Sequence, residues 1–290
     1  MDFFVHLQTG KRIESFIAAP SHALSLSGEP GAGKGMAARY IAACILQTEL
    51  KSVENHPYVH ILDGQASKTG IDEVRKVQTF LTLKVPGADS LKRAVIIENL
   101  DYLRHEAQNA LLKMIEEPPA DTIIIVTFSL NTRVLPTLHS RMQSVNIMPL
   151  DLEYAVKTLE SKFNKKVITQ NYYMSGGLAG LLAALLSREE HHPLVLAINE
   201  ARNIIKMSRF QRLSRVDALL KNKELSPGLL LDGLYRLVDA GYKQSLNVAP
   251  KTSKELKTYA SRLNLIEQSI HDLQDNVQAK LVFSRLFNRL

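Results

Sequence analysis

One twelve-residue stretch constrains the fold of this chain more than any other. Residues 24–35 read LSLSGEPGAGKG, a short apolar run followed by the spacing G-x-x-x-x-G-K. Gly28, Gly31 and Gly33 let the backbone turn its N–H groups inward, and the helix that follows offers its positive N-terminal end. Lys34 would reach the β- and γ-phosphates of a nucleotide. The stretch therefore predicts a phosphate-binding loop between a strand and a helix, with a ligand-free tight turn as the alternative.

The residues that would handle metal and water depart from this motif. The loop usually ends in Ser or Thr, whose hydroxyl binds Mg²⁺, but this chain has Gly35. A partner strand, residues 94–97, leads into Glu98 and Asn99, where an Asp and a water-activating Glu are usual. Glu98 is one methylene longer than Asp, and the Asn99 amide is not a base. Because losing a general base costs about 10²–10⁴ in rate, we expect poor ATP hydrolysis and weak or absent Mg²⁺ binding.

Glu98 also has a simpler reading, in which it lies at the sheet edge beside Lys34. Arg141, in the run Ser140-Arg141-Met142, is a second residue with two readings. Arginine stabilises charge on a transferring phosphoryl group. A single arginine in a sequence is, however, more often the partner in a surface ion pair.

Composition narrows the class of protein. The 290 residues suit two or three domains, and 45% hydrophobic with 22% charged residues is ordinary for a soluble globular chain. The net charge of +7 favours anionic partners such as nucleic acid, or simply reflects a basic solvated surface. The single cysteine, Cys44, excludes an internal disulfide and a cysteine-based zinc cluster, and its apolar helix suggests a core position. No signal peptide or membrane-spanning run is evident, so we expect a cytoplasmic protein.

Strands and helices alternate through the first half of the chain. This order predicts a doubly wound parallel sheet with helices on both faces. The expected strands are residues 24–27, 59–62, 94–97 and 123–128, and the expected helices are residues 9–19 with Thr9 as N-cap, 36–46, 71–83, 105–117 and 133–138.

After Pro149 the apolar periodicity becomes helical throughout. Three short helices are expected at residues 152–163, 170–175 and 178–186, and longer ones at residues 194–206, 213–221, 227–242, 255–263 and 265–287. The pattern predicts three domains: a P-loop domain at residues 1–150, a three-helix domain at 151–188 and an all-α bundle at 189–290.

Two further segments carry a family resemblance. Residues 108–119 read QNALLKMIEEPP and residues 135–143 read LPTLHSRMQ, and together they resemble the bacterial clamp loader family of AAA+ proteins, with Met142 in place of a cysteine. Residues 56–58 and 70–75 also resemble the delta prime type of subunit of DNA polymerase III within that family. The resemblance covers about residues 10–187; beyond that the chain matches only in length and helical character.

The resemblance implies an AAA+ P-loop domain, a three-helix lid and a helical collar that joins subunits into a hetero-pentameric ring. The implied partners are motor and delta subunits, the sliding clamp, and primed DNA contacted through its phosphates. Arg141 would be the arginine finger that reaches the ATP site of a neighbouring motor subunit. Thr127, near the end of the fifth strand, would be the sensor residue.

Departures from the motor subunit point to the delta prime type. The motor subunit carries Thr after the loop lysine, Asp-Glu in the partner strand and a lid arginine at about Ala179, whereas this chain has Gly35, Glu98-Asn99 and alanine. The family's usual zinc module is absent. We therefore expect a non-hydrolysing subunit, and the nearly intact loop leaves open whether it binds ATP or ADP without turnover. The alternatives are an active gamma-like ATPase in which Glu98 holds Mg²⁺, and an AAA+ nucleotide-gated regulatory module.

Overall fold

The computed structural model describes the whole chain except residues 1–2, 66–70, 84–90, 131–133 and 248–252. It separates into two compact units, residues 2–150 and 151–290.

The first unit is built on a five-stranded sheet whose strands pair in parallel in the order β2-β3-β4-β1-β5. Every residue of β4 is buried, as expected for a central strand covered on both faces. The strands are β1 (Ala23–Ser27), β2 (Val59–Asp63), β3 (Arg93–Glu98), β4 (Thr122–Phe128) and β5 (Gln143–Asn146).

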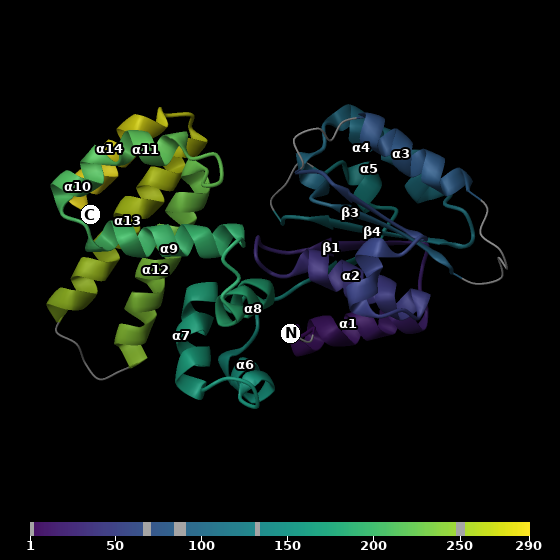
Figure 1. Ribbon diagram of the computed structural model, residues 1–290, viewed down its shortest axis with the longest axis horizontal. Helices are drawn as coiled ribbons and strands as arrows, with labels where there is room; N and C mark the ends of the chain where they lie inside the picture. The colour runs from purple at the N-terminus through teal and green to yellow at the C-terminus, as the bar shows by residue number, and fades with distance from the viewer. Residues whose placement is uncertain (1–2, 66–70, 84–90, 131–133, 248–252) are drawn as a thin grey trace. The chain divides into compact units, whose positions relative to one another are not determined.

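Helices cover both faces of this sheet, which confirms the predicted doubly wound architecture. Figure 1 shows α1 and α2 on one face and α3 and α4 on the other. On the α3 and α4 side, Val95, Ile97, Ile124 and Val126 pack with Leu111 in one apolar cluster. The helical segments are α1 (Leu7–Ala18), α2 (Lys34–Leu46), η1 (Leu50–Asn55), α3 (Ile71–Thr82), η2 (Leu100–Tyr102), α4 (His105–Glu116) and α5 (Pro136–His139).

A buried ion pair fastens the amino end of the sheet. Arg93, which begins β3, donates to both carboxylate oxygens of Asp121 at 2.8 and 3.0 Å and to the carbonyl oxygens of Phe80 and Leu83 at 2.8 and 2.9 Å. Burial alone would raise the pKa of the Asp121 carboxyl, but hydrogen bonds from Arg93 and Thr122 outweigh it, and the pKa is lowered. The pair joins the end of α3 to the strands.

Four details of the first unit differ from expectation. The strand β5 was not predicted, because Val145 is its single buried residue and no apolar run marks it. Thr127 lies on β4, the fourth strand, not on a fifth. The N-cap of α1 is His6, whereas Thr9 is buried and its hydroxyl bonds the backbone around β5. Cys44 is half-buried and not a core residue.

The helix expected at residues 133–138 is shorter than predicted. Its observed form is α5, which begins at Pro136, and residues 131–133 lie outside the described part of the chain.

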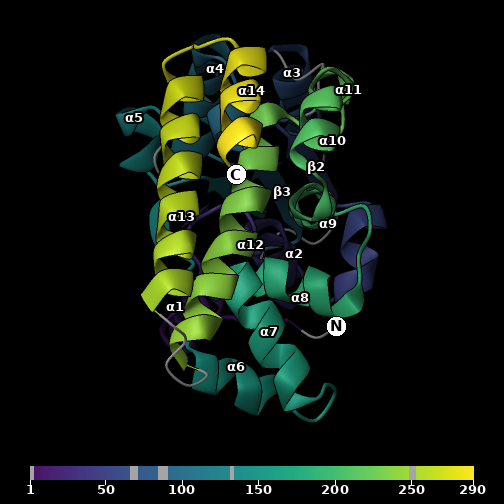
Figure 2. The same ribbon diagram turned by 90° about the vertical axis from the view of Figure 1, so that its left-hand side faces the viewer.

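The second unit is entirely helical in its described residues. The long helix α12 packs against α9 and α13, and Figure 2 shows α12, α13 and α14 lying side by side. A Cβ on Gly233 of α12 would come within 2.5 Å of the Ala197 backbone, so this glycine allows α12 to lie close against α9. The helices are α6 (Leu152–Leu159), α7 (Lys165–Ser175), α8 (Ala179–Ser187), α9 (Pro193–Lys206), α10 (Arg209–Ser214), α11 (Val216–Lys221), α12 (Pro227–Asn247), α13 (Ser253–Gln274) and α14 (Ala279–Arg289).

One predicted break in this unit is wrong. Helices were expected at residues 255–263 and 265–287, but α13 continues without interruption to Gln274. The chain turns instead near Asn276, whose φ of 60° is left-handed. Within the unit, Arg236 of α12 donates to the carbonyl oxygen of Ser175 at the end of α7, at 3.2 Å. The further division at residue 188 into lid and collar stays a prediction.

Candidate functional site

The glycine-rich loop connects the carboxyl end of β1 to the first residue of α2. Gly31 and Gly33 have φ values of 88° and 91°, in the left-handed region that glycine adopts without strain. A Cβ on Gly28 would lie 3.1 Å from the carbonyl oxygen of Ile147, so the loop begins in close contact with the chain after β5. The glycines therefore produce the tight turn that the sequence motif predicts.

Lys34 lies folded over this loop. Its side-chain nitrogen donates to the carbonyl oxygens of Gly28 and Glu29 at 2.9 and 3.0 Å, and the residue is 8% exposed. Burial lowers the pKa of the Lys34 ammonium, and the charges of Asp101 and Glu29 oppose that shift. The ammonium and the turned backbone fit a phosphate ligand, whose oxygens would replace the two carbonyl acceptors.

The site of the missing hydroxyl is filled by other side chains. A Cβ on Gly35 would lie 2.3 Å from Oε1 of Glu98 and 3.1 Å from Nη1 of Arg39. Arg39 Nη1 donates to Glu98 Oε1 at 2.5 Å, and Arg39 Nε donates to Glu54 at 3.0 Å. Glu98 thus occupies the space of a residue-35 side chain and pairs with Arg39. The alternative that it lies at the sheet edge beside Lys34 stays a prediction. These residues do not fit a bound Mg²⁺.

Asn99 joins the carboxyl ends of three neighbouring strands. Its side-chain nitrogen donates to Asp63 Oδ1 on β2 at 2.8 Å, and its backbone nitrogen donates to the hydroxyl of Thr127 on β4 at 3.1 Å. The Thr127 side chain is buried and holds the end of β3 in place. A sensor role for Thr127 stays a prediction.

Sequence reasoning missed two residues of this site. Arg39 follows Gly35 by one helical turn, a spacing that places both on the same face of α2 and could have identified it. Asp101 follows Glu98 by three residues and is near enough to influence Lys34. Its Oδ1 is buried and has no hydrogen-bond partner within the described part of the chain.

Arg141 lies near the amino ends of the strands, at the end of the sheet opposite the loop. It precedes β5, whose Gln143 pairs with Leu24 at the amino end of β1, whereas the loop begins after the carboxyl end. The guanidinium donates to the carbonyl oxygen of Thr137 at 2.8 Å and pairs with Glu116 at 2.5 Å, with 39% of the side chain exposed. The structure does not bring Arg141 together with the loop of its own chain.

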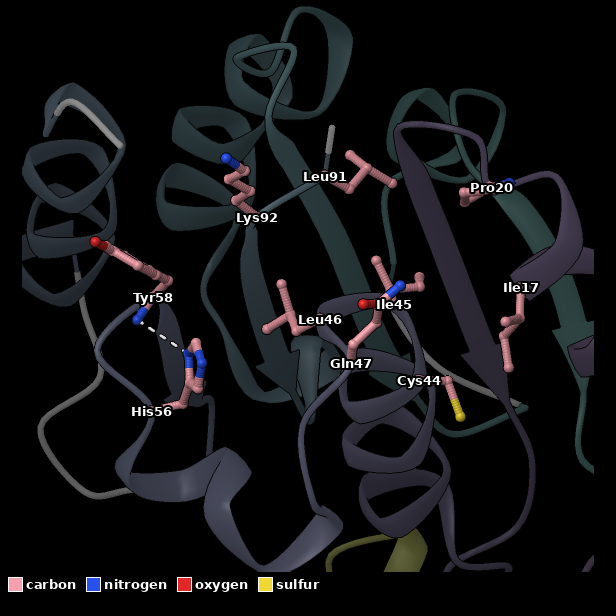
Figure 3. A pocket seen from close by; sticks show the side chains of 10 residues that line it. All are labelled: Ile17, Pro20, Cys44, Ile45, Leu46, Gln47, His56, Tyr58, Leu91 and Lys92. Atoms are coloured by element: carbon pink, nitrogen blue, oxygen red, sulfur yellow. Dashed lines mark hydrogen bonds between the residues drawn. The ribbon is translucent and has the colours of Figure 1, made fainter. Parts of the chain in front are cut away.

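A pocket of about 760 Å³ lies near the amino ends of the strands and is distinct from the loop (Figure 3). Cys44 and Lys92 line it, together with His56, whose Nδ1 accepts from the backbone nitrogen of Tyr58 at 3.2 Å.

Among the described residues, no cluster of His, Cys, Asp and Glu could hold a metal ion. None of the described helices is long and apolar enough to cross a membrane.

Comparison with known proteins finds relatives of the first unit. The family model described as DNA polymerase III, delta subunit, matches residues 16–151. DNA polymerase III subunit delta' of Bacillus subtilis is 29% identical over 143 residues, which cover 45% of this chain and 43% of that protein. The delta' subunit of Escherichia coli is 31% identical over 143 residues, covering 47% and 42%. The matches thus span less than half the length of these relatives.

A solved structure extends the likeness of fold to the whole chain. The structure of a DNA polymerase III gamma subunit-related protein from Thermotoga maritima covers 97% of this chain and 98% of its own, with a TM-score of 0.55 and 18% identity. Such a likeness concerns the fold alone, a parallel sheet followed by helices. Over residues 16–151 the chain is similar to the DNA polymerase III delta subunit family and to its delta' subunits.

Proposed function

We propose that this chain is the delta prime-like subunit of a clamp loader, that it does not hydrolyse ATP, and that it supplies Arg141 to the ATP site of a neighbouring motor subunit. The observation that carries the proposal is the position of Arg141 near the amino ends of the strands, whereas its own loop follows the carboxyl end of β1. From Gln143 to Asn146 the strand alone spans roughly 10 Å, and Arg141 lies further back still. Its guanidinium is therefore suited to an ATP site on another chain.

Three features of the loop support the absence of hydrolysis. Gly35 offers no hydroxyl, Glu98 is paired with Arg39, and the amide of Asn99 donates to Asp63 and cannot accept a proton. A water molecule at this site would lack a positioned general base, which costs about 10²–10⁴ in rate.

The remaining elements of the proposal follow from the family. The chain would join motor and delta subunits in a five-membered ring through its helical second unit, help to open the sliding clamp, and contact primed DNA through phosphates. A net charge of +7 is consistent with that contact. The compartment would be the cytoplasm, where the chromosome is copied in bacteria.

The direct test is ATP hydrolysis by a loader reconstituted with motor and delta subunits. We expect Arg141→Ala to abolish the contribution of the one site that it serves, since an arginine finger is worth about 10³–10⁵ in rate, while assembly measured by gel filtration is unchanged. Arg75→Ala is the matched control, because Arg75 is 66% exposed on the same unit and pairs only with Asp72 in the described contacts. Unchanged turnover in Arg141→Ala would contradict the finger role.

Two measurements separate the competing functions. An isolated chain that hydrolyses ATP faster than about 0.1 s⁻¹, with loss of that activity in Glu98→Ala, would favour an active gamma-like ATPase, since working phosphoryl-transfer sites reach about 1–100 s⁻¹. Failure of the tagged chain to retain motor and delta subunits in a pull-down would favour a regulatory AAA+ module outside replication.

A further inference from the structure

We propose that the guanidinium of Arg39 replaces Mg²⁺ at the phosphate loop, so that the loop binds a nucleoside diphosphate without any divalent metal. This inference concerns the loop of the chain itself and does not depend on the role of Arg141. It follows from what lies in the space where residue 35 of an ordinary loop would carry its metal-binding hydroxyl.

The distance of the guanidinium from residue 35 matches the distance expected for a metal. A Mg²⁺ ion bound to a side-chain hydroxyl at about 2.0–2.1 Å would lie roughly 3 Å from the Cβ of that residue. Arg39 Nη1 lies 3.1 Å from the point where a Cβ on Gly35 would be. The same nitrogen contacts Glu98 Oε1 at 2.5 Å, and that carboxylate ends the strand that usually carries the metal-binding Asp. A positive charge therefore lies at about the distance from residue 35 that a metal would have, beside the carboxylate of the partner strand.

Arg39 is held there from both sides. Its Nε donates to Glu54 at 3.0 Å while Nη1 donates to Glu98, and its side chain is 21% exposed. A guanidinium has five N–H donors, and hydrogen bonds within the described part of the chain use two of them. Donors thus remain for an oxygen of a phosphate lying on the loop.

The charge balance selects the ligand. A guanidinium supplies one positive charge where Mg²⁺ supplies two, and it must already neutralise Glu98. Glu29 and Asp101 add negative charge close to Lys34. The site is therefore better matched to ADP than to ATP, which carries one more negative charge.

The experiment is isothermal titration of the full chain with ADP, once in EDTA and once with excess MgCl₂. We expect the same affinity in both buffers, within about twofold. In Arg39→Ala the affinity in EDTA should fall about tenfold to a hundredfold, the range for a lost hydrogen bond from a charged group, and Mg²⁺ should restore part of it because Glu98 is released. Arg75→Ala is the matched control and should behave as the parent in both buffers.

Three results would overturn the proposal: no binding of ADP to the parent chain, a tenfold or greater gain in parent affinity on adding Mg²⁺, or unchanged affinity in folded Arg39→Ala. If circular dichroism shows that Arg39→Ala is unfolded, Glu98→Gln decides, because it keeps the guanidinium and should keep metal-free binding. Loss of metal-free binding in that variant would also overturn it. Arg141→Ala should bind ADP normally, so a failure here leaves the test of the finger standing.

Discussion

Restoring the hydroxyl of the phosphate loop should destabilise the protein. In Gly35→Thr the new Cβ would lie 2.3 Å from Oε1 of Glu98, closer than real atoms approach, so the carboxylate must shift, and we expect the shift to break its ion pair with Arg39. Removing one partner of a fully buried pair costs about 3–5 kcal/mol, and a charged hydrogen bond is worth about 1.5–3 kcal/mol. The two side chains are 21% and 15% exposed, which favours the lower figure.

We therefore expect Gly35→Thr to lose about 1–3 kcal/mol of unfolding free energy, or about 2–12 °C in the melting temperature of the first unit. Far-UV circular dichroism is the suitable probe, because the chain has no tryptophan. Gly228→Thr is the control, since a Cβ on Gly228 of α12 meets nothing within 4 Å. Its effect should stay within a few tenths of a kcal/mol, because threonine is a slightly better helix former than glycine.

A double-mutant cycle makes the reasoning refutable. If the cost arises from Glu98, then Gly35→Thr made in a Glu98→Ala background should be nearly neutral, with a coupling energy of about 1–3 kcal/mol. An equal cost in both backgrounds, or no cost in the parent, would mean that the Glu98 carboxylate does not occupy this space in solution.

Three other substitutions test the rest of the structure. Asp121→Ala should cost about 3–5 kcal/mol in urea unfolding, because it leaves Arg93 buried and unpaired. The parent should lose this stabilisation as pH falls below about 4, since the folded-state pKa of Asp121 is lowered, and the variant should show a weaker acid dependence. Gly233→Ala should cost about 1–3 kcal/mol by overlap with the α9 backbone, whereas Gly228→Ala should not. Glu116→Gln should leave the unfolding free energy within about 1 kcal/mol of the parent, because its ion pair with Arg141 is exposed. It should raise the ATPase rate of the assembled loader up to about fivefold by releasing Arg141. A tenfold fall in that rate would instead mean that Glu116 positions Arg141.

The sequence predicts the sheet well where burial is continuous. Residues 94–97 are apolar without interruption, and residues 123–128 are apolar except for Thr127, because both faces of β3 and β4 are covered; the observed strands begin and end within one residue of those runs. Edge strand β5 escapes such reasoning, since Val145 is its single buried residue and its pairing with β1 uses backbone groups that carry no sequence signature.

The helix break predicted at residue 264 in the second unit is wrong because the sequence pattern was misleading there. Asn264 interrupts the apolar pattern, but it is exposed, and Ile266 continues the buried face of α13. A polar residue on the solvent side therefore does not end a helix. The true turn near Asn276 depends on a left-handed residue, for which asparagine is a weak signal.

The phosphate loop could be recognised from the sequence because its residues are consecutive. The contact between Arg39 and Glu98 beside it could not, because those residues are far apart in the chain. Seven consecutive residues, 28–34, carry the glycine pattern and Lys34, so this one stretch suffices to identify the loop. The contact between Arg39 and Glu98 joins residues 59 positions apart in the chain, and its meaning depends on the absent side chain of Gly35. Each of these residues is unremarkable alone, and only their arrangement in space shows why a metal does not fit.

The opposite placement of the loop and Arg141 would allow one chain to lack metal binding at its own loop and still provide the proposed arginine to a neighbour. Both are attached to the paired strands β1 and β5, but the loop follows the carboxyl end of β1 and Arg141 precedes the amino end of β5. A change at Gly35 or Glu98 alters side chains at the carboxyl ends of the strands. It leaves the hydrogen bond of Arg141 to Thr137 and its ion pair with Glu116 untouched. Under the proposed function, hydrolysis at the chain's own loop and the donation of Arg141 would therefore be separable properties of the same sheet, and a subunit could keep the second without the first.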